Sequence, residues 1–411
     1  MNNSTTLFEM ALQLTKPWFI SSVSLSTPEN SSVGQLDIYI DFERGGQFLD
    51  ASGVLCSAYD TDERSWQHLN FFEHRCFIHA RVPRIKSSTG EVVTVTVPWA
   101  RPGSGFTLMF EAYAMLLIEY EMPISKVATS LRVVANRLWR MFNYWVTDAV
   151  QADILEGVTR VGIDETSSKK GHNYVTVCAD LAEKRVAFVQ IGRGADAVKD
   201  FASAIVEKGG KVEAIKQVSI DMSTAYISGV TEHLPQAEIT FDKFHVMALL
   251  GKAMDELRKG ERRGNELLKG HKYTVLHNYE NLSTEKQNDL DYLLMAYPRL
   301  GEGYRLKEMF TEFWNIKDGE SAESYLAFWC DMVMETDIQP FKKFVNTIKG
   351  HWSGIINYIK SGINSGIMEG INNKIQLAKR RARGYRNMTN FMNMIYFIAG
   401  KLKFSYPHYP L

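Results

Sequence analysis

The pattern of apolar and polar residues divides the chain into stretches of different predicted structure. Residues 36–100 alternate β-branched and aromatic residues with polar ones, and glycine-rich and serine-rich breaks interrupt them, which predicts strands joined by turns. Apolar residues within 105–150 recur at spacings of three and four, which predicts helices. From residue 159 strand-like runs alternate with helical ones, and residues 246–360 have an almost wholly helical pattern.

The stretch 105–150 predicts two helices separated by a tight turn near Arg132 and Val133. Such a helix-turn-helix places its second helix in the major groove of DNA. The outward-facing residues of that helix, which would contact the groove, are Asn136, Arg137, Arg140 and Asn143. A plain helical hairpin that links two domains is the alternative interpretation.

The order of elements after residue 159 predicts an α/β fold. Three strands in a meander are followed by a helix around Ala195–Glu207, a strand, a helix from Ser223 and a last strand. This is a ribonuclease-H-like arrangement, in which helices cover both faces of a mixed sheet. The helical stretch that follows is too long for a loop and predicts an all-α insertion. The predicted domains are a β-rich subdomain (1–104), a helix-turn-helix region (105–150), a catalytic domain (151–245 with 361–411) and the insertion (246–360).

Two of the predicted strands end in an aspartate. The segments VGID and VSID end at Asp164 and Asp221, and in each the apolar residues occupy the opposite phase to the carboxylate. If these strands are neighbours in a parallel sheet, both carboxylates lie at its C-terminal edge, where open α/β sheets bind ligands. Two carboxylates that close repel each other unless a cation neutralises them. Oxygen ligands of this kind favour Mg²⁺ or Mn²⁺.

A third carboxylate, Glu369, lies on the helix predicted after the insertion. At about 100° per residue, the apolar side of that helix consists of Ile367, Ile371, Ile375, Ala378 and Ala382. The opposite side consists of Glu369, Asn372, Asn373, Gln376, Arg380 and Arg383. A metal ligand beside phosphate-binding side chains is what a DNA-cutting site needs. An ordinary amphipathic surface helix would have the same pattern.

The overall charge does not indicate a nucleic-acid partner, because Lys+Arg and Asp+Glu each number 47. Two local basic clusters are candidate DNA contacts, although each is also typical of a solvated helix face. They are Lys379, Arg380, Arg381, Arg383 and Arg386, and Arg258, Lys259, Arg262, Arg263, Lys269 and Lys272. The chain has no run of eighteen apolar residues, no secretory signal and no CxxC spacing among its four cysteines. We therefore expect a reduced, cytoplasmic protein.

Four segments closely resemble the ISL3 family of bacterial insertion-sequence DDE transposases, over about residues 36 to 400. They are VGIDETSSKKGHNYVTV, SIDMSTAYISGV, ITFDKFHVM and GINSGIMEGINNKIQLAKRRARGYRNMTNF. The resemblance implies that Asp164, Asp221 and Glu369 are the catalytic triad. It implies that they hold two Mg²⁺ or Mn²⁺ ions for the cleavage and joining of DNA strands. Asp242 and His245 also match a family motif, either as a structural pair or as accessory groups of the site.

The resemblance also implies partners and one departure from the family. The expected partners are terminal inverted repeats and target DNA, bound by a homodimer or larger assembly associated with the nucleoid. The basic arm that would hold the phosphate backbone consists of Asn373, Lys379, Arg380, Arg383 and Arg386. Relatives carry a small zinc ribbon, whose four ligand positions correspond here to Leu49, Ser52, Lys86 and Thr89. None of these residues can bind zinc, so no structural zinc is expected.

Two other functions remain open. The chain could be a domesticated, catalytically silent transposase that only binds DNA, although the intact triad argues against this. It could also be a nuclease of the same fold that does not join strands, although the DNA-reading region favours transposition.

Overall fold

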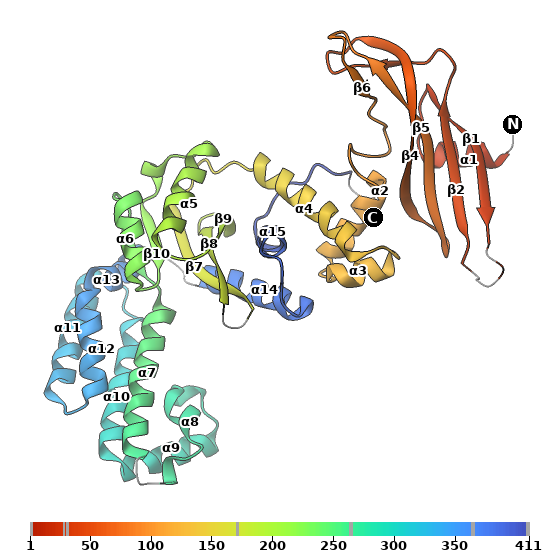
Figure 1. Ribbon diagram of the computed structural model, residues 1–411. Helices are drawn as coiled ribbons and strands as arrows, with labels where there is room; N and C mark the ends of the chain where they lie inside the picture. Colours follow the sequence, from red (N-terminus) through yellow and green to blue (C-terminus); the bar gives the residue numbers. More distant parts are fainter. Residues whose placement is uncertain are drawn as a thin grey trace. The chain divides into compact units, whose positions relative to one another are not determined.

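The computed structural model describes residues 3–27, 29, 33–169, 172–262, 266–362 and 366–407. Within them the chain forms two compact units (Figure 1). The first comprises the residues up to Gln151 together with Arg380–Arg383 and the segment from Lys403, and the second comprises Ala152–Lys379 and Gly384–Leu402. Each unit has a sheet that combines parallel and antiparallel pairing, which confirms a mixed α/β protein. None of the helices in the described ranges combines the length and apolar character needed to cross a lipid bilayer.

The first unit is built on a sheet that has six strands in the described residues. They are β1 (Trp18–Ser26), β2 (Gln35–Phe42), β3 (Gln47–Leu49), β4 (Leu55–Phe71), β5 (His74–Lys86) and β6 (Val92–Thr94), and helix α1 (Asn3–Ala11) precedes them. Their order is β1-β2-β5-β4-β3, with β6 beside β5. The β2–β5 pair is parallel, and the other pairs are antiparallel. Trp99 meets Trp18 and Trp66 edge to face in the core, with ring centroids 5.0 and 5.7 Å away.

The segment EVVTVTVPW (91–99) has the alternating pattern of a strand, but the strand that forms there is shorter. Only Val92–Thr94 pairs with β5. The chain then leaves the sheet, and Val97 and Trp99 turn into the core, where each is 7% exposed. Burial of a large apolar side chain contributes about 1.5–3 kcal/mol, whereas one more hydrogen bond contributes about 1 kcal/mol. Burial therefore outweighs a longer strand.

Three helices follow the sheet in the described part of the first unit: α2 (Leu108–Glu119), α3 (Ile124–Ser130) and α4 (Ala135–Ala152). The turn between α3 and α4 lies where the sequence predicts it, and Arg132 adopts a left-handed backbone there, with φ of 55°. The buried Glu111 of α2 accepts hydrogen bonds from Arg101 Nε, Ser104 Oγ and Trp145 Nε1 at 2.9, 2.5 and 2.8 Å. One carboxylate therefore joins the segment before α2 to α4.

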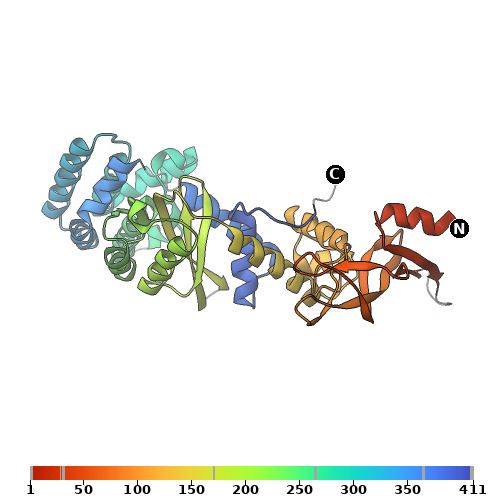
Figure 2. The ribbon, with the colours of Figure 1, turned by 90° about the horizontal axis from the view of Figure 1, so that it is seen from above.

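The second unit is built on a sheet of five described strands. They are β7 (Arg160–Lys169), β8 (His172–Asp180), β9 (Arg185–Ile191), β10 (Gln217–Ile220) and β11 (Glu238–Phe241), in the order β11-β10-β7-β8-β9. The β11, β10 and β7 strands are parallel, and β7, β8 and β9 form an antiparallel meander. The flanking helices are α5 (Ala195–Glu207), α6 (Thr224–His233), α14 (Gly366–Ala382) and α15 (Met388–Ala399). Figures 1 and 2 show α5 and α6 on one face of the sheet and α14 and α15 on the other.

Between β11 and α14 the described chain is helical, as the sequence predicts. The helices are α7 (Lys243–Arg262), α8 (Lys272–Leu276), α9 (Thr284–Ala296), α10 (Pro298–Phe313), α11 (Gly319–Glu335), α12 (Gln339–Gly350) and α13 (Trp352–Ser361). Short 3₁₀ turns occupy Val212–Ala214, Glu266–Leu268 and Tyr279–Asn281. Pro298 and Pro340 lie in the first turns of α10 and α12, where proline suits a helix start. The helix α13 packs on β11, which ties the helical region to the edge of the sheet.

Candidate active site

Three aspartates lie in one row just beyond the pairing of the parallel strands. The strand predicted to end at Asp164 continues to Lys169, because it still pairs with β8 there. Val218 of β10 pairs with Val161 of β7 and with Ile239 of β11. Three residues further along each strand stand Asp164, Asp221 and Asp242. The Asp242 amide donates to Ile220 O at 3.0 Å, so the ladder between β10 and β11 continues to this row. The two aspartates predicted to be neighbours are therefore brought together, and Asp242 joins them.

Each aspartate of the row is half-buried and oriented by its own chain. The Oδ1 atoms of Asp164, Asp221 and Asp242 accept the backbone N–H groups of Glu165, Ser223 and Phe244 at 2.7, 2.9 and 2.8 Å. These bonds fix one oxygen of each carboxylate, and those of Asp221 and Asp242, which accept the N–H group two residues further on, have the geometry of an Asx turn. The other oxygens remain for further contacts.

The helix α14 lies against this row. Asn372 Nδ2 donates to Asp164 Oδ2 at 2.6 Å. One turn later Gln376 Nε2 donates to Thr166 Oγ1 at 3.3 Å. Glu369 is exposed and lies one turn before Asn372, so it is on the side of α14 that faces the row.

The close approach of α14 depends on a residue without a side chain. A Cβ atom at Gly162 would stand 2.7 Å from the Met368 side chain. The buried residues of α14 are Met368, Ile371 and Ile375. Ile367, Ala378 and Ala382, which the sequence analysis placed on the apolar side, are half-buried. The buried stripe therefore runs through Met368, because the helix must reach Gly162.

The carboxylates of the site repel one another. Burial raises the pKa of Asp242, and the charges of Asp164 and Glu369 raise it further, against the lowering effects of the Phe244 amide and His245. Burial also raises the pKa of Glu165, where Arg193 opposes it and the charges of Asp221 and Asp164 add to it. The edge of the sheet therefore concentrates negative charge.

The donor set has the chemistry of a magnesium site, because it consists of carboxylate oxygens. Among the described residues, however, no three Asp, Glu, His or Cys side chains are close enough together to hold an ion as they stand. The Asn372 amide also occupies Asp164 Oδ2. Binding of an ion would therefore require carboxylates to rotate or α14 to shift by a small amount.

The predicted DNA-reading residues of α4 differ in exposure. Asn136 and Arg140 are exposed, and Asn143 is half-buried. Arg137 is used internally: Nη2 donates to Gly105 O at 3.1 Å, and the guanidinium lies 4.2 Å from the centre of the Phe106 ring. Burial lowers the pKa of Arg137. Of these residues, Asn136 and Arg140 are the most available to a ligand.

The predicted basic arm lies at the end of α14. Asn373, Arg380, Arg383 and Arg386 are exposed. Lys379 is half-buried, and burial lowers its pKa. In the second basic cluster Arg258 is buried and donates to Asp255 Oδ1 at 2.8 Å. Arg263 of that cluster lies outside the described residues.

The four positions that correspond to zinc ligands lie at the ends of β3 and β5 and on the loops that follow, which a carboxylate joins. Asp50 Oδ1 accepts the backbone N–H groups of Ser52 and Val54, each at 2.9 Å. Asp50 Oδ2 accepts Ser88 N and Ser88 Oγ at 2.9 and 2.8 Å. The loops after β3 and after β5 are therefore held together by Asp50.

The histidines and cysteines near these loops have other partners. His68 bonds to Thr107 Oγ1 at 2.8 Å, and His74 Nδ1 accepts Gly34 N at 2.9 Å. His79 bonds to Ser65 and Asp37 at 2.7 and 2.8 Å. Cys76 is buried and Cys56 half-buried. The histidines therefore form hydrogen bonds between strands of the sheet and to the segments that connect them.

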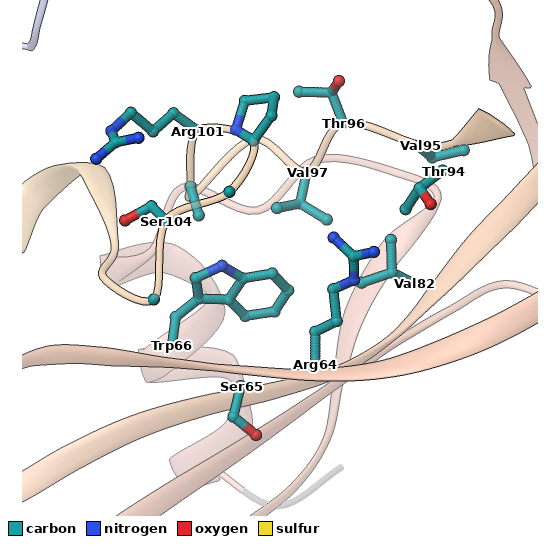
Figure 3. A pocket seen from close by; sticks show the side chains of 14 residues that line it. Arg64, Ser65, Trp66, Val82, Thr94, Val95, Thr96, Val97, Arg101 and Ser104 are labelled. Carbon is teal, nitrogen blue, oxygen red and sulfur yellow. The ribbon is translucent and has the colours of Figure 1, made fainter. Parts of the chain in front are cut away.

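A half-open pocket of about 420 Å³ in the first unit holds none of the predicted site residues. Figure 3 shows Arg64 and Trp66 of β4 beneath the segment from Thr94 to Ser104.

The sequence analysis missed two features of the second unit. The place of Asp242 in the row could have been found, because ITFD ends a strand in the same way as VGID and VSID. The position of Arg193 beside Glu165 depends on tertiary pairing.

Comparison with known proteins identifies the class and then the family. A family model described as "Transposase" matches residues 161–395, which includes the aspartate row and most of α14 and α15. A second model, described as "Helix-turn-helix domain of transposase family ISL3", matches residues 95–146. The protein is thus of the transposase class, with a DNA-binding helix-turn-helix. The chain belongs to the ISL3 family of transposases.

Two similar curated proteins are transposases of insertion sequences. The transposase for insertion sequence element IS1001 of Bordetella parapertussis is 32% identical over 239 residues, or 56% of this chain and 58% of that protein. The transposase for insertion sequence element IS1557 of Mycobacterium tuberculosis is 27% identical over 370 residues, or 82% of both chains. The match to the Bordetella protein thus spans a little over half of its length.

Proposed function

We propose that the protein binds the terminal inverted repeats of an insertion sequence and catalyses divalent-metal-dependent cleavage and joining of DNA strands. The observation that carries this proposal is the aspartate row, with α14 held against it by the Asn372–Asp164 hydrogen bond. The strand order β11-β10-β7-β8-β9 supports a ribonuclease-H-like catalytic domain (151–245 with 361–411) that an all-α insertion (246–360) interrupts. The residues before it would form the β-rich subdomain (1–104) and the helix-turn-helix (105–150).

Asp164, Asp221 and Glu369 would hold the divalent ions, and Asp164, which has Asp221 as its neighbour in the row and bonds to α14, would help to hold both. When bound, two Mg²⁺ or Mn²⁺ ions would activate water or a 3′-hydroxyl and stabilise the departing 3′-oxygen. The protein's own contribution is positioning. The backbone N–H bonds at the strand ends and the Asn372 amide orient the carboxylates, and Gly162 lets α14 approach them. Asp242 and His245 would act as accessory groups, with Asp242 placed beside Asp221 in the row.

DNA would be held by α4 and by the basic arm in different ways. Asn136, Arg140 and Asn143 of α4 would contact the terminal repeat, and Arg137 would support them from within. Asn373, Lys379, Arg380, Arg383 and Arg386 would contact backbone phosphates. A homodimer or larger assembly in the cytoplasm, on nucleoid DNA, would bring two element ends together.

The test is cleavage of DNA that carries the element's ends by Asp164→Ala, Asp221→Ala and Glu369→Ala, in Mg²⁺ and in chelator. Each variant should cut on the order of 10³-fold more slowly than wild type, because several kcal/mol of charge stabilisation are lost. Each should still bind the DNA. Asp289→Ala, which removes an exposed carboxylate of α9, should cut normally. Wild-type cutting by all three variants would overturn the assignment.

The same assay separates two other functions. A domesticated, catalytically silent protein would bind the ends without any magnesium-dependent nick. A nuclease without strand joining would nick the ends but give no product in which a freed 3′-end is joined to a target plasmid. The aspartate row argues against a catalytically silent protein, and the helix-turn-helix match favours transposition over a nuclease without strand joining.

A further inference from the structure

The turn between β9 and α5, Gly192-Arg193-Gly194, lies on the same side of the sheet as the aspartate row. The strand β9 is antiparallel to β8, and β8 is antiparallel to β7. The strand β9 therefore runs in the same direction as β7, β10 and β11. Its C-terminal end points to the edge where the three aspartates stand.

This turn is held in place by a buried hydrogen-bond network. Thr176 Oγ1 donates to Gly192 O at 3.0 Å and bonds to the Tyr226 hydroxyl at 2.9 Å. Gly192 N donates to Tyr174 O at 2.9 Å. Thr176 and Tyr226 are 0% and 2% exposed. The backbone just before Arg193 is therefore fixed from the interior of the domain.

The two glycines give this turn a backbone that other residues adopt only with strain. Gly192 and Gly194 have φ of 99° and 106°. A Cβ atom at Gly194 would also stand 3.4 Å from Ala225 at the start of α6. The turn therefore presents Arg193 next to the first turns of α5 and α6.

The Arg193 side chain is held loosely above the surface. Its guanidinium is 63% exposed, lies 3.8 Å from Glu165 and stands 4.9 Å from the centre of the Tyr174 ring. Among the described residues it makes no hydrogen bond. An exposed ion pair of this kind contributes little to stability. The buried hydrogen bonds therefore stabilise the turn more than the Arg193–Glu165 ion pair does.

We propose that Arg193 binds a backbone phosphate of the DNA strand next to the scissile phosphate. This inference rests on the proposed function of the aspartate row. Glu165 directly follows Asp164, so a guanidinium beside Glu165 stands next to the row. DNA that enters an edge rich in carboxylates needs local positive charge, and arginine can bind a phosphate through two N–H groups. The Tyr174 ring contacts the guanidinium through a cation–π interaction, which favours this position of the side chain before DNA binds.

The test compares Arg193→Ala with a matched arginine in the full-length protein. Arg299 of α10 is also exposed, at 53%, and pairs with Glu261 at 3.2 Å, but it belongs to the helical region. We expect Arg193→Ala to lower the cleavage rate at saturating DNA about 10-fold and to reduce the slope of log affinity against log salt by about 1. Arg299→Ala should change neither quantity. Arg193→Lys should keep the salt slope and recover part of the rate, because the charge remains.

The thermal unfolding midpoint separates a phosphate contact from a structural role. It should be the same in Arg193→Ala as in wild type. A wild-type salt slope and a wild-type cleavage rate in Arg193→Ala would overturn the inference while leaving the aspartate row in place. If the wild-type protein itself does not cut, the proposed function fails, and the salt slope alone still tests the phosphate contact.

Discussion

Carboxylates near strand ends have opposite surroundings in the two units: hydrogen-bond donors in the first and other carboxylates in the second. Asp50 of the first unit accepts four hydrogen bonds, and these lower its pKa to about 2, with the Ser88 amide making the largest contribution. In the second unit Asp242 accepts a backbone hydrogen bond from Phe244, and burial and neighbouring carboxylates raise its pKa. A carboxylate that the protein satisfies closes loops. A row of carboxylates that repel one another is prepared for a cation.

The largest expected effect comes from pushing α14 away from the row. Gly162→Val adds a branched side chain where a Cβ atom already stands 2.7 Å from Met368. Overpacking of this kind costs about 1–3 kcal/mol of stability. We expect cleavage to fall at least about 10²-fold, because an error of about 1 Å in the position of a catalytic group has that effect. Binding of end DNA through the helix-turn-helix should persist.

Gly251→Ala is the control for this variant, because its added Cβ atom would meet nothing within 4 Å. It should cut like wild type. Normal cutting by Gly162→Val would mean that the position of Glu369 relative to the aspartates does not affect cleavage. The aspartate row of the second unit would then have no demonstrated role that Asp50 of the first unit lacks.

The next largest effect tests the amide that holds Asp164. Asn372→Asp replaces a donor, 2.6 Å from Asp164 Oδ2, with a fifth carboxylate beside Asp164, Asp221, Asp242 and Glu369. The added negative charge should lower the magnesium concentration needed for half-maximal cleavage, because a cation relieves the repulsion. The loss of the N–H donor that orients Asp164 should slow the reaction about 10-fold. A magnesium titration of single-turnover cleavage measures both. Lys374→Ala, on the exposed side of the same helix, should leave the titration unchanged, and an identical titration for both variants would contradict this role.

Much of the catalytic sheet is predictable because its signals are local. Periodicity places α5 at Ala195–Glu207, and Ser223 precedes α6 as expected. The phase of VGID and VSID predicts that Asp164 and Asp221 share one face, and the parallel pairing of β7 with β10 makes them neighbours. These features follow from strand geometry alone.

Other features depend on packing between distant segments. The periodicity of α14 is satisfied by more than one stripe, and only the cavity at Gly162 selects Met368. Arg137 looks like a groove-reading residue by its phase, but it contacts Gly105 and Phe106, which the helix pattern cannot reveal. Likewise nothing in the spacing around Asp50 announces that its carboxylate reaches the loop at Ser88.

A smaller effect, on stability rather than activity, is expected at Asp50. Its folded pKa of about 2 lies below the ordinary value of 3.8. Its hydrogen bonds therefore stabilise the first unit fully above pH 3.8, and this stability is lost as the pH falls from 3.8 towards 2. In Asp50→Asn the new amide points N–H groups at the Ser88 donors. The variant should unfold several degrees lower at pH 7 and should lack this part of the acid dependence.

Thermal unfolding between pH 7 and pH 2 measures both effects. Asp62→Asn is the control, because Asp62 is 50% exposed and bonds to Arg64 at the surface. Equal acid dependence in wild type and Asp50→Asn would mean that Asp50 does not hold the loops together.

The smallest effect, and the one that separates the two kinds of carboxylate most directly, has the opposite sign. The pKa of Asp242 is raised, so its charge destabilises the folded state, and stability is lost as the pH rises from the ordinary value through the raised one. Asp242→Asn keeps an acceptor for the Phe244 amide but removes the charge. In chelator at pH 7 Asp242→Asn should unfold at a higher temperature than wild type, and its free energy of unfolding should be greater by about 1 kcal/mol or less. Asp289→Asn should not differ from wild type. Magnesium should reduce this gain in stability, because bound cations would neutralise the carboxylates of the wild-type row. A lower midpoint for Asp242→Asn in chelator would show that Asp242 is a satisfied structural carboxylate like Asp50, and the row would then consist of Asp164 and Asp221 alone.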